Sequence, residues 1–354
     1  MESIRHNYIV RSVYYYLCID KILGYFETKK RVDDAINRYL SPDEKRDKSL
    51  YAGIRKDILR TYWYTLAKPD EYFLYGFPQK DIKERKEFVS DIFLTRTLRM
   101  GGGNFAHDER ELSDKFAFCS KTSSLMHRDF MLIQSENDYP KYEILALKTN
   151  RLFFKPNNNC MGRGIFAADI SQKSDAKMYF EKIMEAGGEW IVEEPIIQSN
   201  TMALWNTSSV NTIRYYSFLD DKGNYSVMPH ALRTGRKGTV VDNAGSGGIL
   251  AAVDPESGEV YTDGVDENGI YYKAHPDSGV HYKGWIVPRW EELCRLVEKS
   301  HREYLPNHHY VGWDWALTDE GWTLVEANWG QFIVQYADKI GKKKIFLKNI
   351  GKKK

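Results

Sequence analysis

A short run near the C-terminus carries oxygen-bearing side chains that could act together. Residues 311–330 contain two β-rich stretches on either side of Thr318-Asp-Glu-Gly321, a composition that predicts a hairpin. Glu326 and Asn328 are two residues apart on the second strand and therefore share one face. Asp314 joins that face if the register sets it opposite Glu326, which requires a turn with an odd number of loop residues. Two carboxylates and an amide oxygen there would suit Mg²⁺; the alternative is a surface hairpin with polar residues in water.

A second group of candidates has the composition of a phosphate-binding loop. A strand-like run ends near Lys155 and leads into residues 157–164, which include Gly162, Arg163 and Gly164. Small residues let backbone N–H groups approach phosphate oxygens, and Lys155 and Arg163 add positive charge. The GxxxxGK[ST] pattern of a Walker loop is absent, and a glycine-rich hairpin turn would look much the same. Both interpretations stay open on composition alone.

Two arginines in the middle of the chain could stand beside an anion. Arg214 lies on the strand-like run 211–219, Arg233 ends the run 225–233, and residues 220–224 between these runs have a turn composition. If the two strands are neighbours in an ordered sheet, their guanidinium groups flank one site, where they could bind a carboxylate or a phosphate. The alternative is two surface arginines on an open sheet face.

The elements that must position these residues follow a helical N-terminal region. Apolar residues recur at three- and four-residue spacings over 29–40, 49–66 and 82–98, which predicts helices with no evident chemistry. Mixed strand and helix patterns come next, so the fold class is α+β. We expect a helical N-terminal region (1–110), a first subdomain with Lys155 and the glycine-rich loop (111–195), a second subdomain with the hairpin (196–338) and a basic tail (339–354).

Composition argues against several classes of function. The 354 residues suffice for two or three domains, and a net charge of +2 argues against a dedicated nucleic-acid-binding protein. No apolar run approaches the ~20 residues of a membrane span, no signal-like segment is evident, and the cysteines lack paired spacing, so we expect a cytoplasmic protein. The lysine-rich tail could associate weakly with an anionic surface, although such tails are more often simply solvated. His275 and His281 lack partners spaced for a zinc site.

The order of these motifs resembles the ATP-grasp superfamily, and most of all its sugar-transfer-associated proteins, which are related to amino-acid ligases. A lysine before a glycine-rich loop, an acidic pair, paired arginines, an Asn-Gly-rich loop and a terminal Asp…Glu-x-Asn hairpin occur in succession. The closer resemblance is carried by residues 210–214, 241–248, 275–279 and 312–315. It covers roughly residues 110–335.

This resemblance implies an ATP-grasp fold, in which two α+β subdomains clasp ATP. Lys155 would contact the α- and β-phosphates, Lys115 would be an upstream lysine that also reaches them, and the loop with Gly162, Arg163 and Gly164 would close over the triphosphate. The Glu193 side chain and the Glu194 carbonyl would meet the adenine amino group, with the Ile196 N–H on the ring.

The resemblance also implies a metal and a substrate side to the site. Asp314, Glu326 and Asn328 would hold Mg²⁺, with two ions expected. Arg214, Arg233 and Asn243 would face the transferred phosphate and the carboxylate substrate. The helical first 110 residues depart from the family, because many ATP-grasp ligases begin with a parallel α/β domain that helps bind substrate.

The favoured function is that of an ATP-dependent ligase joining a carboxylate to an amine or hydroxyl through an acyl phosphate. By the resemblance, the carboxylate is an amino or hydroxy acid and the acceptor a sugar or amino-sugar precursor of a surface polysaccharide. Two rivals remain: ATP-dependent phosphorylation of a sugar-like hydroxyl, and a non-catalytic nucleotide-binding partner of a glycan assembly complex. The ligase and the kinase reactions both transfer the γ-phosphate of ATP, so they need the same phosphate-binding and metal-binding groups.

Overall fold

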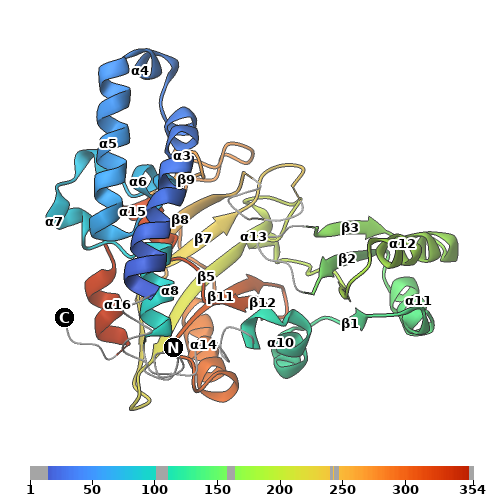
Figure 1. Ribbon diagram of the computed structural model, residues 1–354. Coiled ribbons are helices and arrows are strands. Elements are labelled where there is room, and N and C mark those ends of the chain that lie inside the picture. The colour runs from blue at the N-terminus through green and yellow to red at the C-terminus, as the bar shows by residue number, and fades with distance from the viewer. Residues whose placement is uncertain (1–14, 101–110, 158–163, 240–241, 243–246, 351–354) are drawn as a thin grey trace, which may run out of the picture.

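The computed structural model describes residues 15–100, 111–157, 164–239, 242 and 247–350. A large sheet occupies the middle of the molecule, helices lie on both of its faces, and a smaller lobe projects from its edge (Figure 1). The mixture of helices and sheets confirms the expected α+β fold class.

The N-terminal region is helical, and its sequence places the helix starts. Ser41 and Glu44 form a capping box at the start of α4, and the Asp47 carboxylate accepts the Ser49 and Leu50 N–H groups at the start of α5. The elements are η1 (Tyr15–Leu23), α3 (Gly24–Tyr39), α4 (Pro42–Arg46), α5 (Lys48–Thr65), α6 (Pro69–Leu74), η2 (Phe77–Gln79), α7 (Ile82–Arg85) and α8 (Asp91–Arg99). The continuous helix expected over 82–98 is wrong: Ser90 caps α8 afresh by accepting the Phe93 N–H at 3.2 Å.

The smaller lobe is a four-stranded antiparallel sheet in the order β1-β4-β2-β3 with two helices against it. Its elements are β1 (Phe130–Ile133), η4 (Glu136–Asp138), α11 (Tyr139–Lys148), β2 (Arg151–Pro156), β3 (Phe166–Asp169), α12 (Lys173–Ala186) and β4 (Trp190–Glu193). Phe154 and Phe166 stack across β2 and β3 with ring centroids 4.7 Å apart, and Tyr142 and Phe180 fill the same core.

The large sheet is antiparallel in the order β10-β9-β8-β7-β5-β11-β12, with β6 paired to β5. Its elements are α13 (Asn200–Ala203), β5 (Thr212–Leu219), β6 (Tyr225–Val227), β7 (His230–Thr234), β8 (Ile249–Val253), β9 (Gly264–Val265), β10 (Tyr271–Tyr272), α14 (Trp290–Tyr304), β11 (Tyr310–Leu317) and β12 (Trp322–Asn328). The single strand expected over 225–233 is wrong, because β6 and β7 are separate strands with Pro229 between them, and proline has no N–H to donate.

Both faces of this sheet are covered. Ile213 and Tyr215 of β5 enter a core with α14, whereas Tyr216 and Phe218 enter a second core with the N-terminal helices. The alternation follows from the two-residue period of a strand. Thr212 and Arg214 share the face of Tyr216 but lie beyond the part that those helices cover. One end of this face is therefore left for a site.

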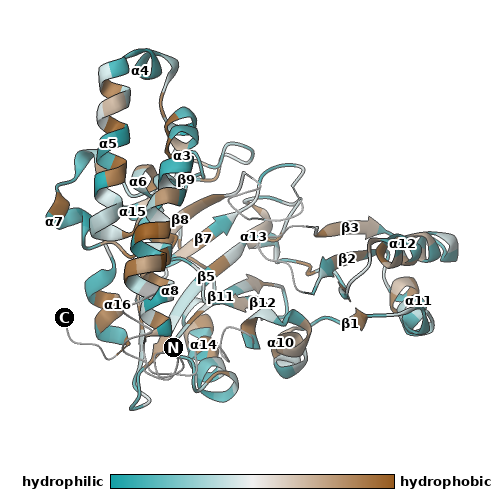
Figure 2. Cartoon of the chain, viewed as in Figure 1, coloured by the Kyte–Doolittle hydropathy of each residue, from teal (hydrophilic) through white to brown (hydrophobic). Residues whose placement is uncertain are grey.

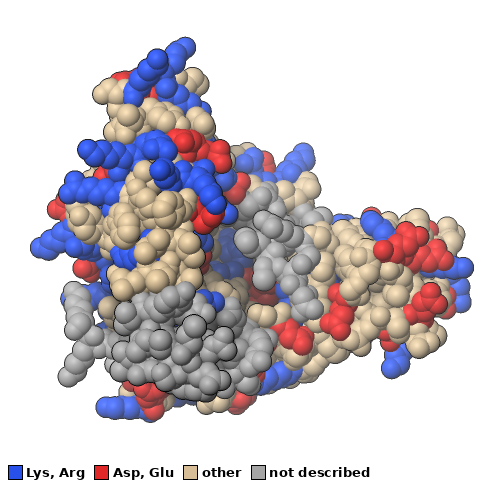
Figure 3. Space-filling model, in the orientation of Figure 1, with Lys and Arg blue, Asp and Glu red and all other residues tan. Residues whose placement is uncertain are grey.

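The C-terminal segment is part of the second core. After β12 come α15 (Val334–Asp338) and α16 (Lys343–Asn349), and Phe346 is completely buried. Hydrophobic and hydrophilic residues alternate along α16 and α5, as expected of helices packed by one face (Figure 2). Within the described residues, the predicted basic tail is therefore largely a packed helix. On the face shown in Figure 3, Lys and Arg side chains gather over the N-terminal helices instead.

The cores also differ from the domain boundaries suggested by the sequence. The helix α10 (Lys115–Lys121) and the turn η3 (Ser123–Leu125) precede the smaller lobe, but Phe118 and Met126 lie in the core of the large sheet. A division by packing would therefore begin the smaller lobe near Phe130. No helix among the described residues is long and apolar enough to cross a membrane.

Candidate active site

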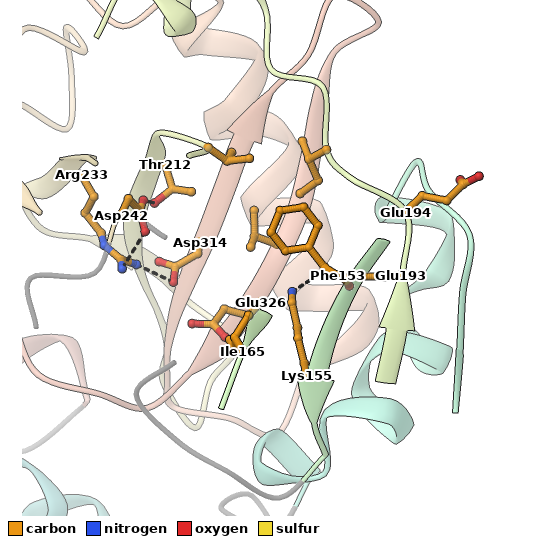
Figure 4. A pocket seen from close by; sticks show the side chains of 13 residues that line it. Phe153, Lys155, Ile165, Glu193, Glu194, Thr212, Arg233, Asp242, Asp314 and Glu326 are labelled. Carbon is orange, nitrogen blue, oxygen red and sulfur yellow. Dashed lines mark hydrogen bonds and ion pairs between the residues drawn. The ribbon is translucent and has the colours of Figure 1, made fainter. Parts of the chain in front are cut away.

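A pocket lies where the smaller lobe meets the uncovered end of the large sheet. Lys155 and Glu193 approach it from β2 and β4, and Thr212, Arg233 and Asp314 approach from β5, β7 and β11 (Figure 4). The pocket encloses about 690 Å³, part of it open to solvent.

The hairpin of β11 and β12 does bring two carboxylates face to face. Asp314 is paired directly with Glu326, and Arg214 of β5 is the neighbour of Asp314 on its other side. The expected odd-numbered turn is wrong, because Thr318 and Gly321 exchange backbone hydrogen bonds around a two-residue turn. A β-bulge supplies the missing residue instead: Val325 is the extra residue of β12, and the register shifts there.

Two arginines enclose Asp314, which is 1% exposed. Arg214 donates to both of its carboxylate oxygens, and Arg233 donates from Nη1 to Oδ2 at 2.8 Å. Arg214 also donates to the Asn328 amide oxygen at 3.3 Å, which brings Asn328 into the same group. Neighbouring strands thus place both predicted arginines beside one carboxylate.

Asp242 is a member of the site that sequence reasoning missed. It is 8% exposed, pairs with Arg233 at 2.9 Å and accepts a hydrogen bond from the Thr212 hydroxyl. It stands directly before Asn243, and nothing in its local pattern separates it from other aspartates in turns. Its contacts with Arg233, on a strand nine residues earlier, and with Thr212 distinguish it.

The pKa values of the two hairpin carboxylates are shifted in opposite directions. Burial alone would raise the pKa of Asp314, but the charges of Arg214 and Arg233 outweigh burial and hold that pKa well below its usual range. Burial and the negative charge of Asp314 raise the pKa of Glu326, and the charges of Arg214, Lys115 and Lys155 oppose this only in part. Glu326 lines the pocket, so protein groups surround its carboxylate but solvent and ligands can still reach it.

The nucleotide-side candidates form a second charged group across the pocket. Lys155 pairs with Oε1 of Glu193, and Arg128 donates to Oε2 at 3.2 Å from both Nε and Nη2. Burial raises the pKa of Glu193, but Arg128 and Lys155 overcome that effect and lower it, so this carboxylate is ionised. Arg128 was also missed, because an arginine before a strand carries no signal of its own.

The remaining predicted residues fall around this group or outside the described residues. Glu194 and Ile196 line the pocket, although the Glu194 carboxylate pairs outward with Lys148 at 2.9 Å. Lys115 begins α10 and is close enough for its charge to act on Glu326. Gly164 has φ +79°, a left-handed conformation that glycine adopts without strain. Gly162, Arg163 and Asn243 lie outside the described residues.

The donor set fits a hard divalent cation shared between protein and ligand. Glu326 and Asp314 repel each other at close range, which a cation between them would relieve, and carboxylate and amide oxygens are the ligands Mg²⁺ prefers. Among the described residues, no three side chains of His, Cys, Asp or Glu form a group that could hold a metal ion. Such a cation would therefore depend on Asn328 and on oxygens brought by a ligand.

Comparison with known proteins gives this arrangement a family. The family model for sugar-transfer associated ATP-grasp proteins matches residues 126–352, more than half of the chain. The chain belongs to this family. It accordingly has the ATP-grasp fold, and ATP-grasp enzymes are ATP-dependent ligases that bind ATP, typically with Mg²⁺.

Solved ATP-grasp structures are similar to this chain only at low identity. D-alanyl-alanine synthetase A from Vibrio cholerae is 10% identical with a TM-score of 0.39, covering 62% of this chain and 55% of that one. D-alanine–D-alanine ligase from Bacillus anthracis is 14% identical with a TM-score of 0.37, covering 69% and 61%. N5-carboxyaminoimidazole ribonucleotide synthetase, as its ADP complex, is 11% identical with a TM-score of 0.39, covering 70% and 53%.

This chain therefore spans little more than half the length of those three enzymes. No curated protein matches the chain significantly.

Proposed function

We propose that this ATP-grasp protein is a ligase that joins a carboxylate to an amine or hydroxyl acceptor through an acyl phosphate. The observation that carries the proposal is the pocket between the lobes, where Lys155 faces the Asp314–Glu326 pair. A lysine opposite two carboxylates, with arginines behind them, is an arrangement suited to a polyphosphate with its divalent cation.

The nucleotide would lie along the lobe interface. In this proposal Lys155 and Lys115 meet the phosphates, the loop with Gly162, Arg163 and Gly164 covers them, and the Glu194 carbonyl and Ile196 N–H hold the adenine. Glu193 was expected on the adenine amino group as well. Its carboxylate is engaged by Lys155 and Arg128, so its role toward adenine stays a prediction.

Asp314, Glu326 and Asn328 would hold Mg²⁺, with two ions expected. A divalent cation held by these residues would supply charge neutralisation for the phosphate oxygens. Hydrogen bonds from Arg214 and Arg233, on neighbouring strands, set the orientation of the Asp314 carboxylate.

The chemistry needs alignment and charge neutralisation more than a strong base. An oxygen of the substrate carboxylate bonds to the γ-phosphorus, the bond to the β-phosphate oxygen breaks, and ADP leaves. The acceptor amine or hydroxyl then bonds to the acyl carbon, phosphate leaves with the electron pair of the C–O bond, and the acceptor proton passes to solvent or phosphate. Arg214, Arg233 and Asn243 would stabilise the approaching anions. The acceptor we propose is a sugar or amino-sugar precursor of a surface polysaccharide.

The test is ADP release with Mg·ATP over a panel of amino and hydroxy acids, with and without amino-sugar or nucleotide-sugar acceptors. Mass analysis of the products identifies what was joined. ADP that depends on the acid, with a condensed product, supports the ligase. A phosphorylated acceptor formed without acid would replace it with a kinase, and ATP binding without turnover would replace it with a nucleotide-binding partner.

A further inference from the structure

Arg128 lies at the crossing from the large sheet to the smaller lobe. It follows η3, whose neighbours pack in the core of the large sheet, and stands two residues before β1. Its side chain is 2% exposed. A buried arginine without partners would be costly, so its contacts indicate what holds it there.

The guanidinium of Arg128 joins strands of both sheets. Toward the smaller lobe it donates to Glu193 of β4 at 3.2 Å, from Nε and from Nη2. Toward the large sheet, Nη1 donates to the Leu324 carbonyl at 2.7 Å and Nη2 to the Val325 carbonyl at 3.3 Å. A planar guanidinium has five donors in a fixed fork and can serve a carboxylate and two carbonyls together, which a lysine ammonium cannot do with the same geometry.

The two carbonyls belong to the bulge that orients Glu326. The strand β12 is the last of its sheet, so groups that face away from β11 need partners outside the sheet. Leu324 pairs with Trp315 and Glu326 with Asp314, and Val325 is the extra residue between them. A bulge leaves its extra residue unpaired within the ladder, and here Arg128 supplies the partner.

Through Glu193, Arg128 is also linked to Lys155, the lysine proposed to bind the nucleotide. Glu193 takes Arg128 on one carboxylate oxygen and Lys155 on the other. Lys155, Glu193, Arg128 and the bulge before Glu326 thus form one continuous chain of contacts across the lobes.

We propose that Arg128 is a positioning residue that couples nucleotide binding at Lys155 to divalent-cation binding at Asp314 and Glu326. The inference rests on the proposed function, because it assumes that both ligands bind in this pocket. A ligand that binds Lys155 changes the charge next to Glu193. Because Arg128 is hydrogen-bonded to Glu193, it then changes position and displaces the backbone carbonyls that orient Glu326. The two affinities are then linked reciprocally.

The experiment measures ADP binding by titration calorimetry with and without Mn²⁺, for the full chain and for Arg128→Lys and Arg128→Met. In the wild type, Mn²⁺ tightens ADP binding. In Arg128→Met we expect this enhancement to fall at least tenfold, about 1.4 kcal/mol of coupling. Arg128→Lys keeps a positive charge beside Glu193, so we expect ADP alone to bind with nearly wild-type affinity while the enhancement is still lost.

Two further measurements separate positioning from general damage. Hydrogen exchange should speed up over residues 322–328 in both Arg128 variants, because neither methionine nor lysine can donate to the Leu324 and Val325 carbonyls with the geometry of the guanidinium. The matched control is Arg151→Met, which removes an exposed arginine of the same lobe that pairs only loosely with Asp169 at 3.6 Å. It should leave both the enhancement and the exchange unchanged.

The outcomes distinguish this inference from the proposed function. If the wild type binds no ADP even with Mn²⁺, the proposed function fails and takes the coupling with it. If the wild type shows the enhancement and Arg128→Lys and Arg128→Met keep it within twofold, only the role of Arg128 is overturned. Should Arg128→Met not fold, Arg128→Lys decides the matter alone.

Discussion

At the scale of single residues, the charged side chains of the site stabilise one another in pairs of opposite charge. Asp314 stays ionised because Arg214 and Arg233 donate to it, and Arg233 is in turn balanced by Asp242. Among the described residues no arginine donates to Glu326 in this way, and its pKa is raised by burial and by Asp314. Glu326 is the group at which a bound cation would change the charge balance most.

The substitution Glu326→Gln should abolish turnover, by 100-fold or more, because it removes one ligand charge at almost constant volume. The fold should not suffer. A glutamate with a raised pKa contributes stability below its unfolded pKa and loses that contribution as pH rises, so a neutral glutamine at this position should not lower the stability at neutral pH. Activity and thermal unfolding in chelator check this, with the exposed turn variant Glu320→Gln as control. Full activity in Glu326→Gln would contradict the metal-site assignment.

The raised pKa of Glu326 also predicts how cation binding depends on pH. A proton competes with the cation for this carboxylate, and it does so at higher pH than for an ordinary glutamate. Below the raised pKa, the affinity for Mn²⁺ should fall by up to about tenfold per pH unit, because one proton is released for each ion bound. Titrations across the acid range measure this. A slope that persists in Glu326→Gln would assign the proton to another group.

At the scale of elements, a single bulge decides which way the second strand of the hairpin faces. Simple alternation would put Leu324, Glu326 and Asn328 on one face. The structure instead places Leu324 in the core opposite Trp315 and Glu326 opposite Asp314, because Val325 takes up one extra position. Gly312 of β11 is paired with Asn328, two residues after Glu326 on β12.

Gly312→Ala should disturb the site more than the fold. An added methyl group would lie 3.2 Å from the Tyr310 hydroxyl and 3.3 Å from both the backbone and side-chain oxygens of Asn328, and these groups would have to shift by a few tenths of an ångström. We expect turnover to fall about tenfold and the free energy of unfolding by about 1 kcal/mol or less. The matched control is Gly53→Ala, where an added methyl group meets nothing within 4 Å, so helix propensity should raise stability by up to ~1 kcal/mol. Unchanged turnover in Gly312→Ala would separate Asn328 from catalysis.

At the scale of the whole molecule, the helical N-terminal region and the C-terminal helix pack on the same face of the sheet that carries the site. Tyr216 and Phe218 of β5 are covered by them, whereas Thr212 farther along the same strand lines the pocket and Arg214 donates to Asp314 of the pocket. The region outside the usual ATP-grasp pattern therefore supports the site from one side through a shared sheet.

Phe346→Ala should reveal how much the C-terminal helix contributes. Phe346 is completely buried and its ring lies 5.2 Å from that of Phe332. Loss of a buried phenylalanine costs about 3–5 kcal/mol, which should lower the midpoint of thermal unfolding markedly. Lys348→Ala, an exposed change on the same helix, should have little effect. Equal stability of both variants would mean that α16 is not part of the fold in solution.

The sequence by itself determined what depends on neighbouring residues and on periodicity. Hairpin composition around residues 318–321, the strand-borne Lys155, and the shared face of Thr212 and Arg214 all follow from local rules, and the order of motifs indicated the family. Only the tertiary structure decided what depends on distant partners. The bulge at Val325, the pairing of Asp242 with Arg233 and the contact of Arg128 with β12 each join separate strands or loops, and no local pattern encodes such contacts. A strand's period fixes its faces, but packing against the rest of the molecule fixes its register and its neighbours.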